Sequence, residues 1–283
     1  MNTPEFGKME TAWCPGCGNF GILDSLKLAL EALGKDPHEV VMVGGIGQAA
    51  KTPQYLSANS FCGLHGRALP PAVAIKMANP NLTVIVNTGD GDSYGEGGNH
   101  FLHNIRRNVD MTHFVHDNQV YGLTKGQSSP TTLEGMVTGA QAEGSQNIPF
   151  NPVLLALAAG AGFVARGFSG KPDHLQMLME RAIRFKGYAL VDIFQPCVSF
   201  NRLNTFAWYN SRVYELDESH DATDRLMAMS RAMEFGDRIP IGVLYEKALP
   251  DFHEKNSSLS QGQVLAGRRN DPALVRRYMS EMV

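Results

Sequence analysis

The chain has 283 residues, and its 25 lysine and arginine residues against 28 aspartate and glutamate residues give a formal net charge of −3. This balance argues against nucleic-acid binding, while 43% hydrophobic residues suffice for a buried core. Its apolar runs are far shorter than the roughly 20 residues of a membrane helix, and residues 1–10 lack a secretory signal pattern. We therefore expect a globular, cytoplasmic protein with no membrane span and no nucleic-acid partner.

Short β-branched runs alternate with helical patterns as far as Asn201, which predicts βαβ units. Because the runs are almost continuously apolar, both faces of each strand should be covered. The fold class is therefore α/β, a mostly parallel sheet with helices on both faces. The expected strands are 40–44, 83–88, 111–117, 162–166 and 189–194, and the expected helices are 20–33, 67–78, 97–108, 152–161 and 171–185.

Two further segments bear on domain organisation. The stretch 127–151 is rich in Ser, Thr, Gly, Gln and Pro and is the longest expected loop, a kind of segment that is often functional. After Asn201 the pattern loosens and charge rises. We expect one domain over 1–202 and a C-terminal extension over 203–283 that packs on it or on a partner subunit.

The central motif is Gly89-Asp90-Gly91-Asp92, which directly follows the expected strand 83–88. Open α/β sheets bind ligands at this end of a parallel strand. Glycines let a backbone approach a diphosphate closely, and a carboxylate oxygen suits magnesium. An Asp-Gly surface turn is the alternative for this motif alone.

A second polar turn, Asp117-Asn118-Gln119-Val120, follows the next expected strand. One helix and one strand fit between Asp90 and Asn118, so the two side chains should project from neighbouring strand ends onto one ion. Together the turns resemble the thiamine diphosphate motif. In proteins with that motif the Asp, the Asn and a backbone carbonyl two residues later hold magnesium, which implies Asp90, Asn118 and Val120.

The stretch from Val120 to Thr131, Val-Tyr-Gly-Leu-Thr-Lys-Gly-Gln-Ser-Ser-Pro-Thr, narrows the resemblance to 2-oxoacid:ferredoxin oxidoreductases. Four further segments are similar to that family: 13–18, 44–47, 64–68 and 195–201. The chain is identified as a member, its beta subunit. The resemblance implies cofactor contacts by Ile46, Gly47, His65, Gly89, Asp90, Gly91, Asp92, Asn118, Val120, Gly122, Leu123 and Thr124, with Arg67 beside His65.

The cysteines suit metal or redox chemistry. Cys14 and Cys17 form a C-x-x-C pair, which alone fits zinc, an iron–sulfur cluster or a dithiol. The resemblance favours a 4Fe-4S cluster with Cys197 as a third ligand. The family pattern continues Gly-Ile-Gly with a ligating cysteine, but here Gln48 follows Gly47. We expect Cys62 to supply the missing ligand; its alternative is a small buried thiol.

The resemblance also implies the reaction and its partners. A 2-oxoacid and coenzyme A would be interconverted with acyl-CoA and CO2, with electrons passing through the cluster to ferredoxin. Lys51 and Lys125 are candidates to hold substrate carboxylates. Leu123 is apolar where some pyruvate-specific relatives are polar, which favours 2-oxoglutarate. The activating Glu would come from a larger alpha subunit, which also completes the substrate and CoA site, in an α2β2 assembly.

Other interpretations remain open. The segment 16–21, Gly-Cys-Gly-Asn-Phe-Gly, matches a dinucleotide fingerprint, but no expected strand precedes it. The cysteines would also suit a structural zinc site in an interaction subunit. Within thiamine enzymes, a non-redox enzyme similar to acetolactate synthase is a further alternative.

Overall fold

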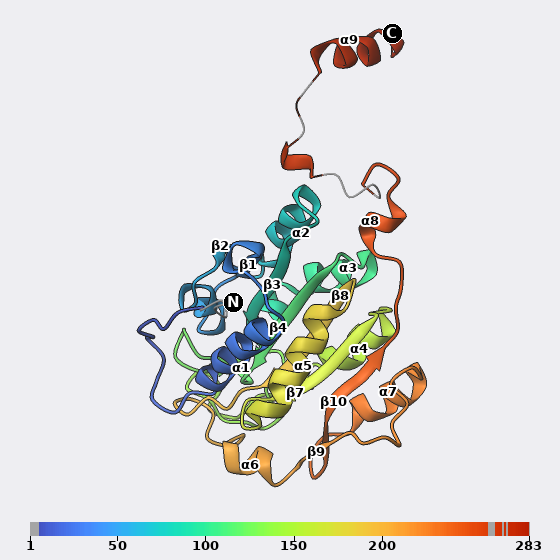
Figure 1. Cartoon of the computed structure of the whole chain (residues 1–283). Helices are drawn as coiled ribbons and strands as arrows, with labels where there is room; N and C mark the ends of the chain where they lie inside the picture. The colour runs from blue at the N-terminus through green and yellow to red at the C-terminus, as the bar shows by residue number, and fades with distance from the viewer. Residues whose placement is uncertain (1–5, 260–263, 268, 270, 283) are drawn as a thin grey trace.

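The computed structural model describes residues 6–259, 264–267, 269 and 271–282. Within them a twisted eight-stranded sheet forms the centre, in the order β2-β1-β3-β4-β8-β7-β10-β9 (Figure 1). All neighbouring pairs are parallel except β7 and β10. The mostly parallel α/β prediction is therefore confirmed. The strands are β1 (Val40–Gly44), β2 (Asn59–Cys62), β3 (Thr83–Gly89), β4 (Met111–Asp117), β7 (Phe163–Phe168), β8 (Tyr188–Phe194), β9 (Val213–Glu215) and β10 (Ile239–Glu246).

The inner strands of the sheet bury both faces, because successive side chains point to opposite sides of the sheet, whereas the edge strand β2 is exposed. Val41 and Val43 belong to one hydrophobic core, whereas Val40 and Met42 belong to the other. Helices α1 (Asn19–Ala32) and α5 (Pro172–Arg184) pack side by side over the second core (Figure 1). The first core is covered by α2 (Leu69–Ala78), α3 (Gly98–Arg107), α4 (Pro152–Ala158) and α7 (Arg225–Met233).

The remaining elements are short. They are the two-stranded ribbon of β5 (Val120–Tyr121) and β6 (Gln127–Ser128), the helices α6 (Phe206–Asn210), α8 (Phe252–Lys255) and α9 (Pro272–Glu281), the 3-10 turns η1 (Pro37–Glu39), η2 (Ala49–Gln54) and η4 (Leu265–Gly267), and the π-helical turn η3 (Gly91–Glu96). Apart from β6, the expected long loop 127–151 contains no helix or strand. No helix in the described ranges combines the length and apolarity that a membrane crossing requires.

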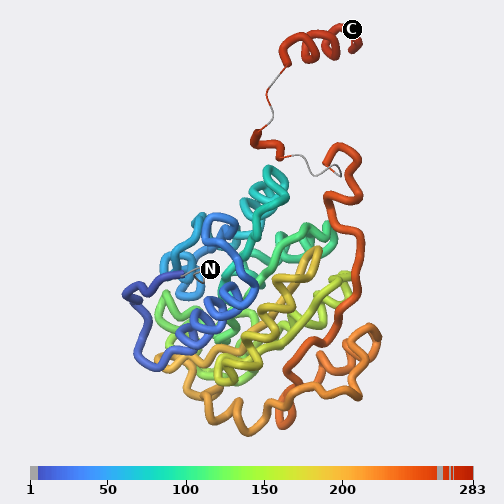
Figure 2. Tube along the Cα trace, in the orientation of Figure 1, coloured from blue at the N-terminus to red at the C-terminus, as the bar shows by residue number. Residues whose placement is uncertain are grey.

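The region after Asn201 contributes more to the sheet than its pattern predicts. Strand β10 pairs with β7 on one side and with β9 on the other. Part of 203–283 therefore belongs to the same sheet. Pro240 and Gly242 interrupt its apolar pattern, and Gly242 has a φ of +139° next to a register shift. Beyond β10 the chain leaves the sheet, and α9 lies away from it with every residue exposed (Figure 2).

The core over α3 can be tested at two adjacent residues. Phe101 is fully buried, whereas its neighbour Leu102 is 37% exposed. Phe101→Ala should lower the free energy of unfolding by about 3 to 5 kcal/mol, because it leaves a cavity. Leu102→Ala, the matched control, should change it by about 1 kcal/mol or less. Urea denaturation followed by circular dichroism measures both, and equal losses would contradict this packing.

Candidate functional site

The two polar turns meet at one edge of the sheet. Strands β3 and β4 are parallel neighbours, with Gly89 paired to His116. Asp90 follows the last residue of β3, and Asn118 follows the last residue of β4. The side chains thus come from adjacent strand ends, where ligands bind in open α/β sheets.

Asp90 is buried and held by hydroxyl groups from the long loop. Ser129 Oγ and Thr131 Oγ1 donate to Asp90 Oδ2 at 2.5 and 2.7 Å. Thr131 Oγ1 also lies 2.8 Å from Asp117 Oδ1. Thr131 therefore places its hydroxyl group between two buried carboxyl groups. Burial, with Asp192 and Asp90 nearby, raises the pKa of Asp117 well above its ordinary value, and burial also raises the pKa of Asp90.

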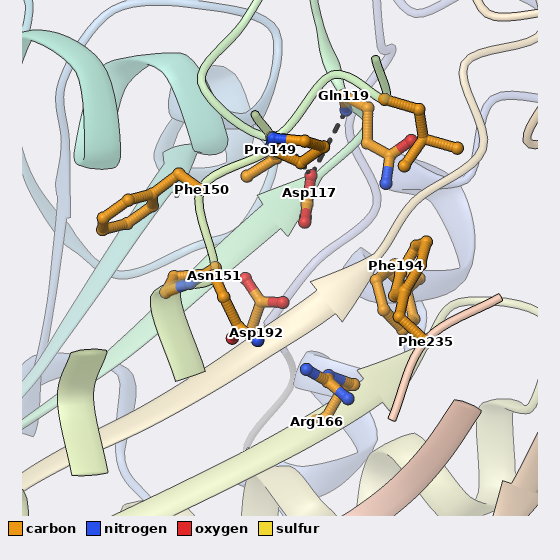
Figure 3. Close-up of a pocket in the computed structure, with 12 residues that line it drawn as sticks. Asp117, Gln119, Pro149, Phe150, Asn151, Arg166, Asp192, Phe194 and Phe235 are labelled. Atoms are coloured by element: carbon orange, nitrogen blue, oxygen red, sulfur yellow. Dashed lines mark hydrogen bonds between the residues drawn. The ribbon is translucent and has the colours of Figure 1, made fainter. Parts of the chain in front are cut away.

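A cavity of about 230 Å³ is lined by Asp117 (Figure 3). Asp192 on β8 and Arg166 on β7 line it, and both are buried. Burial raises the pKa of Asp192 to about 6, although Tyr94 donates a 2.7 Å hydrogen bond to it. Arg166 Nη2 donates to Ala232 O, while its Nε and Nη1 lack protein partners. The carboxylates beneath the motif are therefore incompletely neutralised.

The cofactor pocket, as we call the space above Asp90, has a volume of about 110 Å³. Cβ atoms added at Gly47, Gly89 or Gly122 would meet no protein atom within 4 Å, so these glycines border open space. A diphosphate needs such close backbone approach. All the residues expected to contact the cofactor line this pocket: Ile46, Gly47, His65, Gly89, Asp90, Gly91, Asp92, Asn118, Val120, Gly122, Leu123 and Thr124.

Asp92 organises the pocket walls. It accepts hydrogen bonds from Gly66 N at 2.6 Å and Ile46 N at 3.3 Å, which ties two loops to η3. Burial raises its pKa to about 6. A Cβ at Gly45 would lie 2.0 Å from Asp92 Oδ2, so this contact requires glycine. His65 Nε2 lies 3.7 Å from Asp92 Oδ1 and 3.4 Å from Glu96 Oε2.

The cysteine pocket is a smaller cavity, of about 50 Å³, lined by Cys14, Cys17, Cys197 and Gln48. Cys14 and Cys17 lie in a turn before α1, and the described residues 6–13 ahead of it form no strand, unlike a dinucleotide fingerprint. Burial raises the pKa of Cys17 to about 11 despite a hydrogen bond from the Asn19 backbone. Cys62 does not line this pocket; it ends β2, and its Sγ lies 3.5 Å from Gly45 O.

The two pockets share a wall made by Gln48, Asn118 and Gly122. Gln195 stands behind this wall and contacts both sites. It accepts a 3.1 Å hydrogen bond from Asn118 Nδ2, and its Nε2 lies 3.4 Å from Cys17 Sγ. Because Asn118 Nδ2 is engaged, the amide orientation of Asn118 is fixed.

The expected substrate lysines lie outside the cofactor pocket. Lys51 is in η2 and is partly buried. Arg67, which was expected beside His65, is exposed. Lys125 lines a separate cavity of about 560 Å³, together with Arg202. This cavity adjoins the cysteine pocket through Ser199 and Phe200.

The donor groups fit the expected cofactors in different ways. Asp90, Asn118 and the carbonyl of Val120 supply oxygen atoms, which magnesium prefers. In the described residues, no three His, Cys, Asp or Glu side chains converge closely enough to hold a metal ion. Cys14, Cys17 and Cys197 line one pocket, and their sulfur atoms are the ligand type of iron–sulfur clusters and of zinc.

Sequence reasoning missed the groups that support these sites. Ser129 and Thr131 lie in a loop whose path was unknown, and Asp192 and Arg166 depend on the order of strands β4, β8 and β7. Gln195 is the exception, because it begins the segment 195–201, which the sequence had already identified as similar to the family.

The fold and the cofactor pocket define a thiamine diphosphate-binding domain. Residues 40–193 match the family model described as thiamine pyrophosphate enzyme, C-terminal TPP binding domain. Residues 197–261 match the model for the C-terminal region of the pyruvate ferredoxin oxidoreductase beta subunit. The chain belongs to the family of 2-oxoacid:ferredoxin oxidoreductase beta subunits, as its motifs predicted.

Named relatives agree with this assignment. The chain is 46% identical to a 2-oxoacid:ferredoxin oxidoreductase subunit beta of Saccharolobus solfataricus, over 86% of this chain and 84% of the relative. It is 40% identical to a 2-oxoglutarate synthase subunit KorB of Archaeoglobus fulgidus, over 69% and 73%. A solved 2-oxoglutarate:ferredoxin oxidoreductase from Magnetococcus marinus, with 2-oxoglutarate, coenzyme A and succinyl-CoA bound, superposes with a TM-score of 0.90 at 36% identity, covering 97% and 94%.

Asp90 should control magnesium-dependent cofactor binding. Asp90→Asn keeps the size of the side chain but removes the charge that faces the ion. The affinity for thiamine diphosphate in the presence of Mg²⁺ should fall by about 100-fold, the upper end of what loss of supporting metal contacts costs. Isothermal titration calorimetry measures this. The exposed Asp173→Asn serves as the charge-matched control, and an unchanged affinity in Asp90→Asn would remove Asp90 from the site.

Gln195 should act on the cofactor site through Asn118. Gln195→Leu removes the acceptor for Asn118 Nδ2 and frees that amide to rotate. We expect about tenfold weaker magnesium-dependent binding of thiamine diphosphate, the usual cost of losing a group that orients a metal ligand. Gln195→Glu retains an acceptor and should remain within about twofold of the wild type. If both variants bind equally weakly, the role of Gln195 is only to fill space.

Proposed function

We propose that this beta subunit, with a larger alpha subunit, interconverts 2-oxoglutarate plus coenzyme A with succinyl-CoA plus CO2, passing electrons through a 4Fe-4S cluster to ferredoxin. Magnesium would be held by Asp90, Asn118 and the carbonyl of Val120. Thiamine diphosphate, when bound, supplies the carbanion chemistry. The chain's own residues bind its diphosphate, orient it and separate it from the cysteines.

The observation that carries this proposal is the wall shared by the two pockets. Gln48, Asn118 and Gly122 border both the cofactor pocket and the cysteine pocket, so no further layer of protein lies between them. A non-redox thiamine enzyme, such as one similar to acetolactate synthase, has no use for cysteines beside its cofactor. A structural zinc site would not need a pocket that opens onto the diphosphate motif.

The choice of 2-oxoglutarate is supported by charge and by polarity. Leu123 lines the cofactor pocket and presents no polar group there, while the next residues along this loop lead to Lys125, which with Arg202 lines the separate cavity that adjoins the cysteine pocket. A second carboxylate on the substrate would be attracted to that charge. The relatives named for 2-oxoglutarate are consistent with this choice. Lys51 remains a candidate to bind a substrate carboxylate if the substrate extends as far as η2.

The partner subunit would complete the site. We propose that it supplies the activating Glu and part of the substrate and coenzyme A site, in an α2β2 assembly. Ferredoxin would bind near the cysteine pocket, where Cys14 is exposed and Val198 is 46% exposed.

Substrate choice can be tested on the αβ complex by following coenzyme A-dependent reduction of ferredoxin. We expect a higher kcat/KM for 2-oxoglutarate than for pyruvate. Lys125→Met should lower kcat/KM for 2-oxoglutarate by about tenfold or more, since a charged contact contributes about 1.5 to 3 kcal/mol. Activity with pyruvate should change little.

Lys255→Met, at an exposed site on α8, is the matched control and should leave both substrates unaffected. A wild-type preference for pyruvate would contradict the substrate proposal but not the family. Equal losses for both substrates in Lys125→Met would assign Lys125 a role other than selecting the second carboxylate.

A further inference from the structure

Gln48 is a polar residue on the wall of the cysteine pocket. It lines the pocket together with Cys14, Cys17 and Cys197. Its Oε1 is buried and has no hydrogen-bond partner in the protein. A buried amide oxygen without a partner costs about 1 to 3 kcal/mol unless something else satisfies it. A free acceptor oxygen in a pocket with three thiols points to a bound group that accepts electron pairs, such as a metal ion.

The backbone of Gln48 is held from both sides, so this placement is built into the loop. Trp13 Nε1 donates to Gln48 O at 2.9 Å, and Asp92 holds the preceding loop through Ile46 N. Gly47 turns the chain with a φ of +127°. The side chain makes no capping hydrogen bond to η2, although Gln48 stands at its N-cap. Nothing in the described contacts uses the side-chain oxygen.

Cys62 is in a different position. It ends β2, opposite Gly44 of β1, and its Sγ faces Gly45 O. Cys14 and Cys197 lie near enough to Cys17 to contribute to its raised pKa. Cys62 does not line the pocket that these three cysteines share. The neighbouring strand brings Cys62 close to the glycine turn but not into the pocket.

We propose that Gln48 Oε1 is the fourth ligand of the cluster, so that Cys14, Cys17 and Cys197 bind three irons and an amide oxygen binds the fourth. The inference rests on the proposed function, which places a 4Fe-4S cluster in this pocket. A neutral oxygen is a harder and weaker ligand for iron than a thiolate. The fourth iron should therefore leave more readily than in a four-thiolate site. Replacing one anionic ligand by a neutral one should also raise the reduction potential, as histidine does in other clusters.

The test uses the αβ complex purified without oxygen, in wild-type form and as Gln48→Cys, Gln48→Ala and Cys62→Ser. Ferricyanide takes one electron from the oxidised cluster, the Gln48 oxygen and the sulfides release one Fe²⁺, and a three-iron cluster remains. Iron analysis and electron paramagnetic resonance follow that loss. Titration of the three-iron form with Fe²⁺ then gives the affinity of the fourth position.

We expect the wild type and Cys62→Ser to lose about one iron in four. Gln48→Cys should retain its full iron content of about four per cluster. Gln48→Cys should also have a more negative reduction potential than the wild type. Gln48→Ala should rebind Fe²⁺ about tenfold more weakly than the wild type, as expected for loss of a contact of about 1.4 kcal/mol.

Two outcomes would overturn the inference while the proposed function stands. One is a Cys62→Ser complex that lacks the fourth iron as purified, which would assign the ligand to Cys62. The other is Fe²⁺ rebinding in Gln48→Ala within about twofold of the wild type. A wild-type complex without iron or sulfide would instead refute the proposed cluster itself, and this inference with it. Matching circular dichroism spectra and elution volumes of the four complexes show that the variants fold and assemble.

Discussion

The burial of acidic groups at adjoining strand ends is the constraint on which the site depends. Asp90, Asp117 and Asp192 follow or lie in β3, β4 and β8, and all are buried. Arg166 on the next strand offsets only part of their charge, and burial raises the pKa of Asp117 well above its ordinary value. Buried charges are costly unless paired or bound to metal. Under the proposed function, a divalent cation bound to Asp90 would relieve part of this cost.

A consequence of the sheet is that the cofactor pocket and the cysteine pocket share one wall. The turn after β4 carries Asn118 and Gly122, and the turn after β1 carries Gln48; these residues border both pockets. Gln195, after β8, links Asn118 to Cys17. Parallel strands that end at one edge therefore bring the cofactor motif and the cysteines together, although they are far apart in the chain.

Local patterns predicted the parts of the molecule that depend on local chemistry. Gly89-Asp90 follows an apolar run, so its place at a strand end could be read directly, and every expected cofactor residue lines one pocket. Strand β10 was missed because Pro240 and Gly242 obscure its pattern. The Asp192–Arg166 neighbourhood needs the strand order, which no local pattern encodes. Cys62 lies opposite Gly44 on the neighbouring strand. The direction in which its side chain leaves the strand determines whether the sulfur reaches the cysteine pocket, and the sequence does not give that direction.

The central claim, that one wall separates a magnesium–thiamine diphosphate site from an iron–sulfur site, is tested most directly by composition. The αβ complex should be purified without oxygen and analysed for thiamine diphosphate, magnesium, iron and sulfide. The account predicts thiamine diphosphate and magnesium in amounts equal to this chain, with additional iron and sulfide that disappear when Cys14 and Cys17 are both replaced by serine. Thiamine diphosphate without iron would leave the fold assignment intact and contradict the claim that the cysteine pocket holds a cluster.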